Sequence, residues 1–207
     1  LAREKGLSVQ LIQLSPAGNL TGDARRAYEY ALSAGVAMTP FSECLDLQVG
    51  VVVDALLGTG FVAGADKKAQ VREPFAQAIR MINHSGLPVV AADIPSGLCS
   101  NTGVAADPAV VACLTVSFIG LKQGLYTAQG PACCGEVVYQ DLSVPADIFS
   151  DQCPSASLLQ RQDLMMELAP RRADAHKGDF GHVMVIGGDY GYGGATAMAA
   201  EAALRTG

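Results

Sequence analysis

The sequence of 207 residues contains no tryptophan, few aromatic residues and few charged ones. Aromatic residues make up 6% and charged residues 16% of it, whereas half of all residues are hydrophobic. This balance excludes an intrinsically disordered chain and provides enough apolar surface for one or two folded domains. Lys and Arg number 14 against 20 Asp and Glu, which gives a formal net charge of −6. Such an acidic balance argues against a nucleic-acid-binding surface.

Long apolar runs and paired cysteine motifs are missing as well. The sequence has no stretch of 18 uninterrupted apolar residues, so we expect no membrane-spanning helix and no membrane partner. The six cysteines show no CxxC spacing, and the adjacent Cys133 and Cys134 are poorly arranged for a disulfide or a metal site. We therefore expect reduced thiols in a cytoplasmic protein.

The two ends of the sequence predict a piece of a longer protein. Residues 1–14 have the pattern of a helix tail that runs into a strand, without an initial Met or a signal peptide. Residues 201–207 have the pattern of a helix that reaches its C-cap glycine. Because a domain rarely ends at such points, we expect a fragment that is cut at both ends.

The central feature lies in residues 49–98, where two apolar β-branched runs stop at an aspartate, Asp54 and Asp93, before a glycine-containing turn. Such runs are typical of buried parallel strands that are covered on both faces. Between them, residues 68–83 carry one apolar helical face, formed by Val71, Phe75, Ala78, Ile79 and Ile82. The resulting βαβ unit places both carboxylates at the carboxyl ends of neighbouring strands, where open α/β sheets bind ligands.

Strand and helix patterns alternate through the rest of the first 150 residues. We expect further strands at residues 8–14, 36–39, 109–119 and 136–141. A helix capped by Thr21 and ended by Gly35 has an expected buried stripe of Ala24, Ala27, Tyr28, Ala31 and Leu32. The alternation predicts an α/β fold with a doubly wound, mostly parallel sheet.

The composition changes after Leu142. We expect a linker, a short helix, a strand, a glycine-rich turn and a second helix at residues 143–157, 162–168, 182–186, 187–194 and 195–205. Met165 and Met166 are expected to fill a core in this part. These patterns predict a first domain at residues 1–150 and the beginning of a second α/β domain at residues 151–207.

Asp54 and Asp93 are the strongest candidates for chemistry. A carboxylate at a strand end can ligate a hard cation or act as a general acid or base. Ser96 adds a hydroxyl oxygen beside them, and the turn Gly58-Thr59-Gly60 offers backbone N–H groups for a phosphate. The simpler alternative is that each aspartate caps a helix or forms a turn.

A second cluster precedes the glycine-rich turn of the second part. Arg171, Arg172 and the segment His176-Lys177-Gly178-Asp179 form a basic loop, which is either a solvated surface or a phosphate-facing segment. The glycine-rich loop GGDYGYGG favours a phosphate- or nucleotide-facing role, although it is neither GxGxxG nor a P-loop.

Taken together, these motifs resemble the NAD(P)H-hydrate repair enzymes. The similarity to their N-terminal epimerase domain, a Rossmann-like three-layer sandwich, lies in VVDALLGTG, VVAADIPSGL and LTVSFIGLKQGL. The similarity to the opening of their ribokinase-like dehydratase domain lies in PRRADAHKGDFGHVMVIGGDYGYGGATAMAAEAALRTG. The resemblance implies a bifunctional enzyme. Its first domain would interconvert the R and S epimers of NAD(P)HX, and its second would dehydrate the S epimer with ADP or ATP as phosphoryl donor.

The resemblance also implies roles for individual residues. Asp54 and Ser96 correspond to potassium ligands, and Asp93 corresponds to a substrate-contacting acid–base residue. The hydrate-binding residues that it implies are Gly58, Thr59, Gly60, Phe61, Val62, Ala63, Gly64, Asp93 and Ala195. Lys177 and the glycine-rich loop correspond to positions near the ligand cleft of the dehydratase domain.

The implied cofactors are a potassium ion and ADP or ATP, and the implied substrate is hydrated NADH or NADPH. A homo-oligomer is expected. The family's asparagine- and glycine-rich phosphate loop would precede Leu1, and most of the dehydratase domain would follow Gly207, so we expect the segment alone to be inactive. Two alternatives remain open, a ribokinase-like small-molecule kinase and a non-catalytic nucleotide-binding or interaction module.

Overall fold

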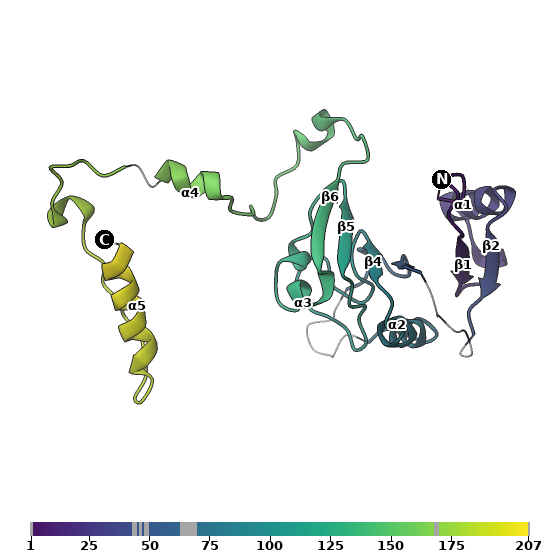
Figure 1. Cartoon of the computed structure of the whole chain (residues 1–207), viewed down its shortest axis with the longest axis horizontal. Helices are drawn as coiled ribbons and strands as arrows, with labels where there is room; N and C mark the ends of the chain where they lie inside the picture. Colours follow the sequence, from purple (N-terminus) through teal and green to yellow (C-terminus); the bar gives the residue numbers. More distant parts are fainter. Residues whose placement is uncertain are drawn as a thin grey trace. The chain divides into compact units, whose positions relative to one another are not determined.

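The computed structural model of the chain describes residues 2–42, 45, 47, 50–62, 70–167 and 170–206 (Figure 1). Contacts divide the chain into two units, Leu1–Ala156 and Ser157–Gly207. The first unit contains two parallel β-sheets with helices in the connections, which confirms the predicted α/β class. The identity of the two predicted domains remains a prediction.

The smaller sheet of the first unit is a βαβ arrangement. Strand β1, Gln10–Gln13, pairs in parallel with β2, Ala37–Pro40. They are connected through the 3₁₀-helix η1, Ala17–Asn19, and helix α1, Gly22–Ser33. Thr21 occupies the predicted N-cap position, although its side chain makes no capping hydrogen bond.

The predicted buried stripe of helix α1 is wrong. No residue of α1 is buried, and Leu32 is 49% exposed. Tyr28 and Ala31 are only half-buried. An amphipathic pattern marks a face that can be buried, but burial needs a second element to pack on it. The described elements leave most of this face open.

The larger sheet has the strand order β3-β4-β5-β6, with all neighbours parallel. Its strands are Val52–Asp54, Val89–Ala92, Leu114–Phe118 and Glu136–Gln140. Helix α2, Phe75–His84, makes the crossover from β3 to β4, as predicted. Two short helices follow β5: the 3₁₀-helix η2, Gln123–Leu125, and helix α3, Gly130–Cys134. The 3₁₀-helix η3, Ala146–Phe149, follows β6.

Helix α2 begins later than predicted. Pro74 is its N-cap residue and is joined to Glu73 by a cis peptide bond. Proline has no N–H to donate in a helix interior and disfavours a helical conformation at the residue before it, so the helix cannot extend back through Glu73. Of the predicted helical range, residues 68 and 69 lie outside the described part of the chain.

One face of the larger sheet is covered by two helices. Ile79 and Ile82 of α2 form a core cluster with Val89, Ala91, Val110 and Ala112. Cys133 and Cys134 of α3 form a second cluster with Ile94, Leu98 and Leu125. The hydroxyl of Thr115 on β5 donates to the Cys134 carbonyl at 2.7 Å, which ties α3 to the same face.

The opposite face of the larger sheet is apolar but open. Val53 of β3 is 66% exposed and Val138 of β6 is 41% exposed, while Val90, Leu114 and Val116 are half-buried. The predicted cover on this second face is not found among the described residues of the first unit. The continuous apolar runs therefore indicate a sheet whose two faces can both be buried, although helices are described on one face only.

Strand β5 is shorter than the predicted range, 109–119. Residues 109–112 direct their backbone hydrogen bonds elsewhere, because Val110 N donates to Ser96 O and Ala112 N donates to Cys133 O. Bonds to the neighbouring strands begin at Cys113, whose N–H donates to Val89 O at 2.9 Å. The Asn83 side chain also bonds to the backbone of this segment, at Ala109 O and Val111 N. The segment is extended but anchored to a turn and to helices α2 and α3.

The adjacent Cys133 and Cys134 are buried at the end of α3. Burial, with a contribution from the neighbouring Cys133, raises the pKa of the Cys134 thiol to about 11, and burial also raises the pKa of Cys133. Both thiols therefore remain protonated at neutral pH and pack as small apolar groups.

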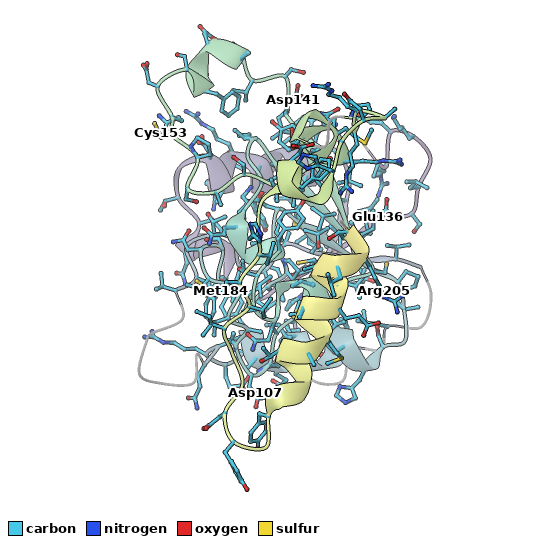
Figure 2. All side chains as sticks on the ribbon, turned by 90° about the vertical axis from the view of Figure 1, so that its left-hand side faces the viewer. Asp107, Glu136, Asp141, Cys153, Met184 and Arg205 are labelled. Atoms are coloured by element: carbon cyan, nitrogen blue, oxygen red, sulfur yellow. The ribbon has the colours of Figure 1, made fainter. Side chains whose placement is uncertain are left out.

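The second unit contains helix α4, Arg161–Glu167, the 3₁₀-helix η4, Lys177–Phe180, and helix α5, Gly193–Thr206. The predicted strand at residues 182–186 is wrong. Met184 lies on an extended segment before α5 and is 82% exposed (Figure 2), and no strand partner for it exists in the described part of the unit. Strand formation requires a partner for its backbone groups. Met165 is 60% exposed, so it does not fill a core, and the Met166 side chain lies outside the described residues.

Among the described residues, no helix combines the length and the apolar composition that a membrane crossing requires.

Candidate functional site

Asp54 is the last residue of β3, and its side chain is almost completely buried, with 1% of the residue exposed. Its Oδ2 accepts a hydrogen bond from the backbone N–H of Ser96 at 2.8 Å. Its Oδ1 accepts from the Ser96 hydroxyl at 2.7 Å and from the backbone N–H of Leu56 at 3.2 Å. The carboxylate therefore joins the turn after β3 to the turn after β4.

Ser96 reinforces this junction through a second set of contacts. Its Oγ accepts from the backbone N–H of Leu57 at 2.8 Å. The same hydroxyl lies 3.2 Å from the Leu57 carbonyl, but its single proton is better placed on Asp54 at 2.7 Å. The Ser96 carbonyl accepts from Val110 N at 2.9 Å. Ser96 is 1% exposed, so these bonds form away from water.

The Asp54 carboxylate is an unpaired buried acid in the described part of the chain. Burial raises the pKa of Asp54 above its usual value, while the hydrogen bonds from Ser96 and Leu56 act in the opposite direction. None of the described Lys, Arg or His side chains forms an ion pair with it. An isolated buried charge is costly unless a counter-charge or a cation accompanies it. The oxygen atoms of Asp54 and Ser96 suit a hard cation.

Ser96→Ala is expected to destabilise the protein by about 1–3 kcal/mol, because Asp54 Oδ1 and the Leu57 N–H would both lose a partner in a buried site. Urea unfolding of the complete gene product would measure the loss. Exposed Ser8 offers a matched control, and Ser8→Ala should change the free energy of unfolding by no more than about 0.5 kcal/mol. Equal stabilities of the two variants would contradict the structural role of the Ser96 hydroxyl.

Asp93 directly follows the last residue of β4, which pairs with β3. It therefore lies at the carboxyl end of the strand beside that of Asp54, as predicted. Its backbone is in the left-handed region, with φ 72°, and its N–H donates to Val116 O at 2.8 Å. Its Oδ1 accepts from Phe118 N at 2.9 Å and forms an ion pair with Lys122. The Asp93 side chain is 26% exposed, so the carboxylate is held firmly and still reaches solvent.

The predicted hydrate-binding loop follows Asp54. Phe61 N donates to Gly58 O at 3.2 Å, which closes a turn, and the Ser100 hydroxyl donates to Thr59 O at 3.3 Å. A side chain at Gly60 would meet open space, and Val62 is 76% exposed. The turn therefore lies beside the segment after β4 and presents its backbone to solvent. Ala63 and Gly64 lie outside the described residues.

Sequence reasoning missed Lys122 as a member of this site. The signal for it was present, because β5 is the next strand of the same parallel sheet and its carboxyl end shares the edge with Asp54 and Asp93. Applied to β5, the rule that ligand-binding residues lie after the carboxyl ends of parallel strands would have pointed to the turn after Phe118. Apart from this rule, nothing in the sequence marks a single lysine 29 positions after Asp93 as a site residue.

The second unit contains the remaining candidate residues. Ala195 lies in the first turn of α5. Arg171 stacks on the Phe180 ring at 4.4 Å and donates to Thr206 O at 2.8 Å. Arg172 pairs with Asp174, which lowers the pKa of that carboxyl. The described arginines of the basic loop therefore have partners within the unit, and the Lys177 side chain is not described.

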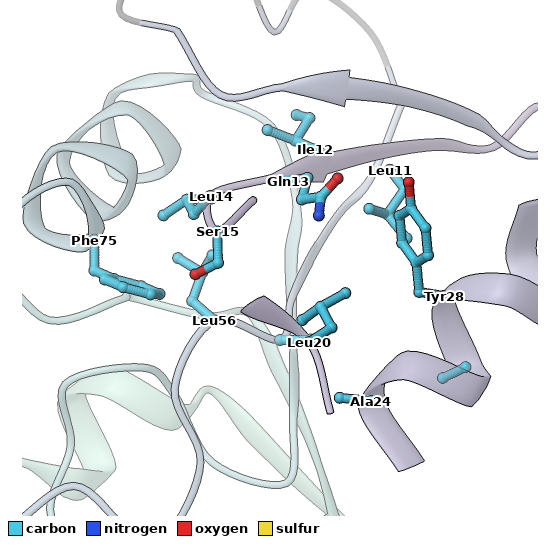
Figure 3. Close-up of a pocket in the computed structure, with 12 residues that line it drawn as sticks. Leu11, Ile12, Gln13, Leu14, Ser15, Leu20, Ala24, Tyr28, Leu56 and Phe75 are labelled. Carbon is cyan, nitrogen blue, oxygen red and sulfur yellow. The ribbon is translucent and has the colours of Figure 1, made fainter. Parts of the chain in front are cut away.

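A mainly apolar cleft of about 430 Å³ lies in the first unit and reaches the turn after Asp54. Figure 3 shows its lining, which includes Leu11 and Gln13 of β1, Tyr28 of α1, and Leu56 and Phe75. The Gln13 side-chain amide nitrogen is buried in it without a hydrogen-bond partner among the described residues. The same Leu56 donates its backbone N–H to Asp54.

Comparisons with known proteins show which family this chain belongs to. Residues 1–124 match the family model described as "YjeF-related protein N-terminus". The bifunctional NAD(P)H-hydrate repair enzyme Nnr of Coxiella burnetii is 41% identical over 207 residues, which are 100% of this chain and 41% of the relative. The enzymes of the same name from Vibrio cholerae and Escherichia coli are 37% and 35% identical over 100% of this chain and over 41% and 39% of their own lengths.

The chain thus spans about two fifths of the length of these relatives. The matched region contains both strand-end aspartates, the Gly58–Phe61 turn, Ser96 and Lys122. The chain therefore belongs to the family of YjeF-related protein N-termini.

Proposed function

We propose that the first unit is an NAD(P)HX epimerase, which interconverts the R and S epimers of hydrated NADH and NADPH. The observation that carries this proposal is the placement of Asp93, partly exposed, at the sheet edge that also holds the buried Asp54–Ser96 pair. Relatives that align with the whole chain are named NAD(P)H-hydrate repair enzymes, which supports the substrate class.

Asp93 supplies the acid–base chemistry in this proposal. The hydroxyl-bearing carbon of the hydrate lies next to a ring nitrogen, whose lone pair can form an iminium as the C–O bond breaks. The protonated form of Asp93 transfers its proton to the departing hydroxyl, so that water leaves and the carboxylate that pairs with Lys122 remains. Water then adds to the opposite face of the ring, the iminium bond returns its electrons to nitrogen, and Asp93 takes back the proton. The product is the other epimer.

The residues that would hold a potassium ion are Asp54 and Ser96. Their oxygen atoms and the unpaired buried charge of Asp54 fit a cation. When bound, the ion would supply a fixed positive charge that offsets the Asp54 carboxylate. The backbone of the Gly58–Phe61 turn contacts the substrate, with Val62, Ala63 and Gly64 continuing the predicted binding loop.

For the second unit we propose the opening part of an ADP-dependent dehydratase domain, with Ala195 as a hydrate contact. The relatives are named bifunctional, and their similarity continues past residue 124 to the end of the chain. ADP or ATP would donate the phosphoryl group that converts the hydroxyl into a better leaving group. A cytoplasmic location and a homo-oligomeric state also stay predictions.

The test uses the complete gene product with racemic hydrated NADH and ADP, with and without potassium. The return of reduced-nicotinamide absorbance is followed over time. Recovery of all the hydrate is the expected result, because the epimerase supplies the dehydratase with S epimer. Fast recovery of only half of the hydrate, with the rest recovered no faster than the epimers interconvert spontaneously, would contradict the epimerase. No recovery would favour the small-molecule kinase, and potassium-dependent binding without turnover would favour a binding module.

A further inference from the structure

Lys122 is a partly buried lysine that the proposed chemistry does not yet use. Its side chain is 16% exposed. Its Nζ pairs with Asp93 Oδ1, donates to the Phe118 carbonyl at 2.7 Å and lies 3.3 Å from the Ser117 hydroxyl. An ammonium group has three N–H donors, and these three acceptors use all of them. Lys122 therefore has no N–H left for a substrate.

The turn that carries Lys122 is anchored to strand β6. Ile119, directly after β5, has φ 64°, a left-handed conformation that is costly for a β-branched residue. Its N–H donates to Gln140 O at 2.8 Å, and its carbonyl accepts from the Tyr139 hydroxyl at 2.8 Å. These two bonds hold the turn in the conformation that returns Lys122 to Asp93.

Asp93 is fixed from its own side as well. Its left-handed backbone is held by the bond from its N–H to Val116 O. Its Oδ1 accepts both hydrogen bonds that reach the carboxylate, one from the backbone N–H of Phe118 and one from Lys122 Nζ. In the described part of the chain no hydrogen bond reaches Oδ2. One carboxylate oxygen is thus fully engaged, and the other is available to a ligand.

We propose that Lys122 is a positioning residue for Asp93. Its ammonium holds Oδ1 against Phe118 and leaves Oδ2 as the oxygen that exchanges a proton with the substrate. This inference rests on the proposed epimerase function. Because the ammonium is saturated by protein acceptors, its loss affects the geometry of the reacting carboxylate more than the binding of substrate. Loss of the Lys122 ammonium should therefore lower kcat of epimerisation and leave KM nearly unchanged.

The test compares Lys122→Met and Lys122→Arg in the complete gene product, with Lys5→Met at an exposed lysine as the matched control. Lys122→Met should lower kcat of epimerisation by roughly 10- to 100-fold, because a displaced catalytic group loses near-attack geometry, while KM changes by less than about 3-fold. Lys122→Arg should recover part of kcat, and Lys5→Met should match the wild type.

A chemical rescue separates positioning from simple loss of packing. Lys122→Ala removes the side chain, and added ethylammonium should restore part of its kcat, whereas tetramethylammonium, which has no N–H, should not. Dehydration of pure S epimer takes place in the other domain, so folding of the first domain is checked instead by the circular-dichroism spectrum and the thermal midpoint of each variant, which should match those of the wild type. A normal kcat in Lys122→Met, or a raised KM with unchanged kcat, would overturn the positioning role alone. An inactive wild-type epimerase would overturn the proposed function and this inference with it.

Discussion

Replacing Asp93 should leave the complete gene product able to repair only the S half of racemic hydrated NADH. General acid–base catalysis by one side chain contributes about 10²- to 10⁴-fold to a rate, so epimerisation should fall by that factor in Asp93→Asn and Asp93→Ala. Dehydration of S epimer takes place in the other domain and should keep its rate. The measurement is the amplitude of reduced-nicotinamide absorbance after the fast phase, which should drop to half of the wild-type value.

The two substitutions separate chemistry from backbone strain. Asp93 has φ 72°, a conformation that asparagine adopts readily and alanine does not. Asp93→Asn therefore keeps the turn and removes the acid–base group, while Asp93→Ala adds strain of about 1–2 kcal/mol. Asp151→Asn, at an exposed position of the linker, is the matched control and should behave as wild type. Full recovery by Asp93→Asn at the wild-type rate would exclude Asp93 as the acid–base residue.

The sequence was sufficient to predict where Asp54 and Asp93 lie. Both follow β-branched runs, and the rule that ligand-binding residues gather at the carboxyl ends of parallel strands brings them to one edge. The bond between Asp54 and Ser96 could not be predicted, because it depends on how two turns 42 positions apart meet. The same strand-end rule would have pointed to the turn that carries Lys122, but the ion pair between Lys122 and Asp93 depends on how β4 and β5 pair and could not be predicted.

Two of the errors of sequence reasoning share one physical cause. The strand predicted at residues 182–186 and the buried stripe predicted for α1 both have the expected local pattern, yet neither has a described partner. A periodic pattern records which face of a segment can be buried, while burial itself is a property of two elements. The start of α2 differs in kind, because Pro74 is a local signal that outweighs the apolar spacing before it.

Potassium should raise the stability of the wild-type protein and leave Asp54→Asn unchanged. A ligand that binds only the folded state adds about 2.7 kcal/mol at 100 times its Kd, which corresponds to several degrees in Tm. Thermal unfolding of the complete gene product in potassium chloride and in tetramethylammonium chloride of equal ionic strength would measure the difference. Asp151→Asn, which removes an exposed carboxylate, should keep the full potassium response. Equal responses of wild type and Asp54→Asn would place the ion elsewhere.

The pH dependence gives the same site a second, independent readout. Burial raises the pKa of Asp54 in the folded state above the ordinary value of 3.8, so the folded state binds more protons than the unfolded state between 3.8 and the raised pKa. Without potassium, this group should therefore make stability fall as pH rises through that window and stay constant above it. Asp54→Asn lacks this fall, although its amide nitrogen cannot accept the bonds that the second carboxylate oxygen accepts and therefore lowers its stability at every pH. A bound cation favours the carboxylate, so potassium should remove the fall in wild type. A fall of the same size in Asp54→Asn would assign it to another group.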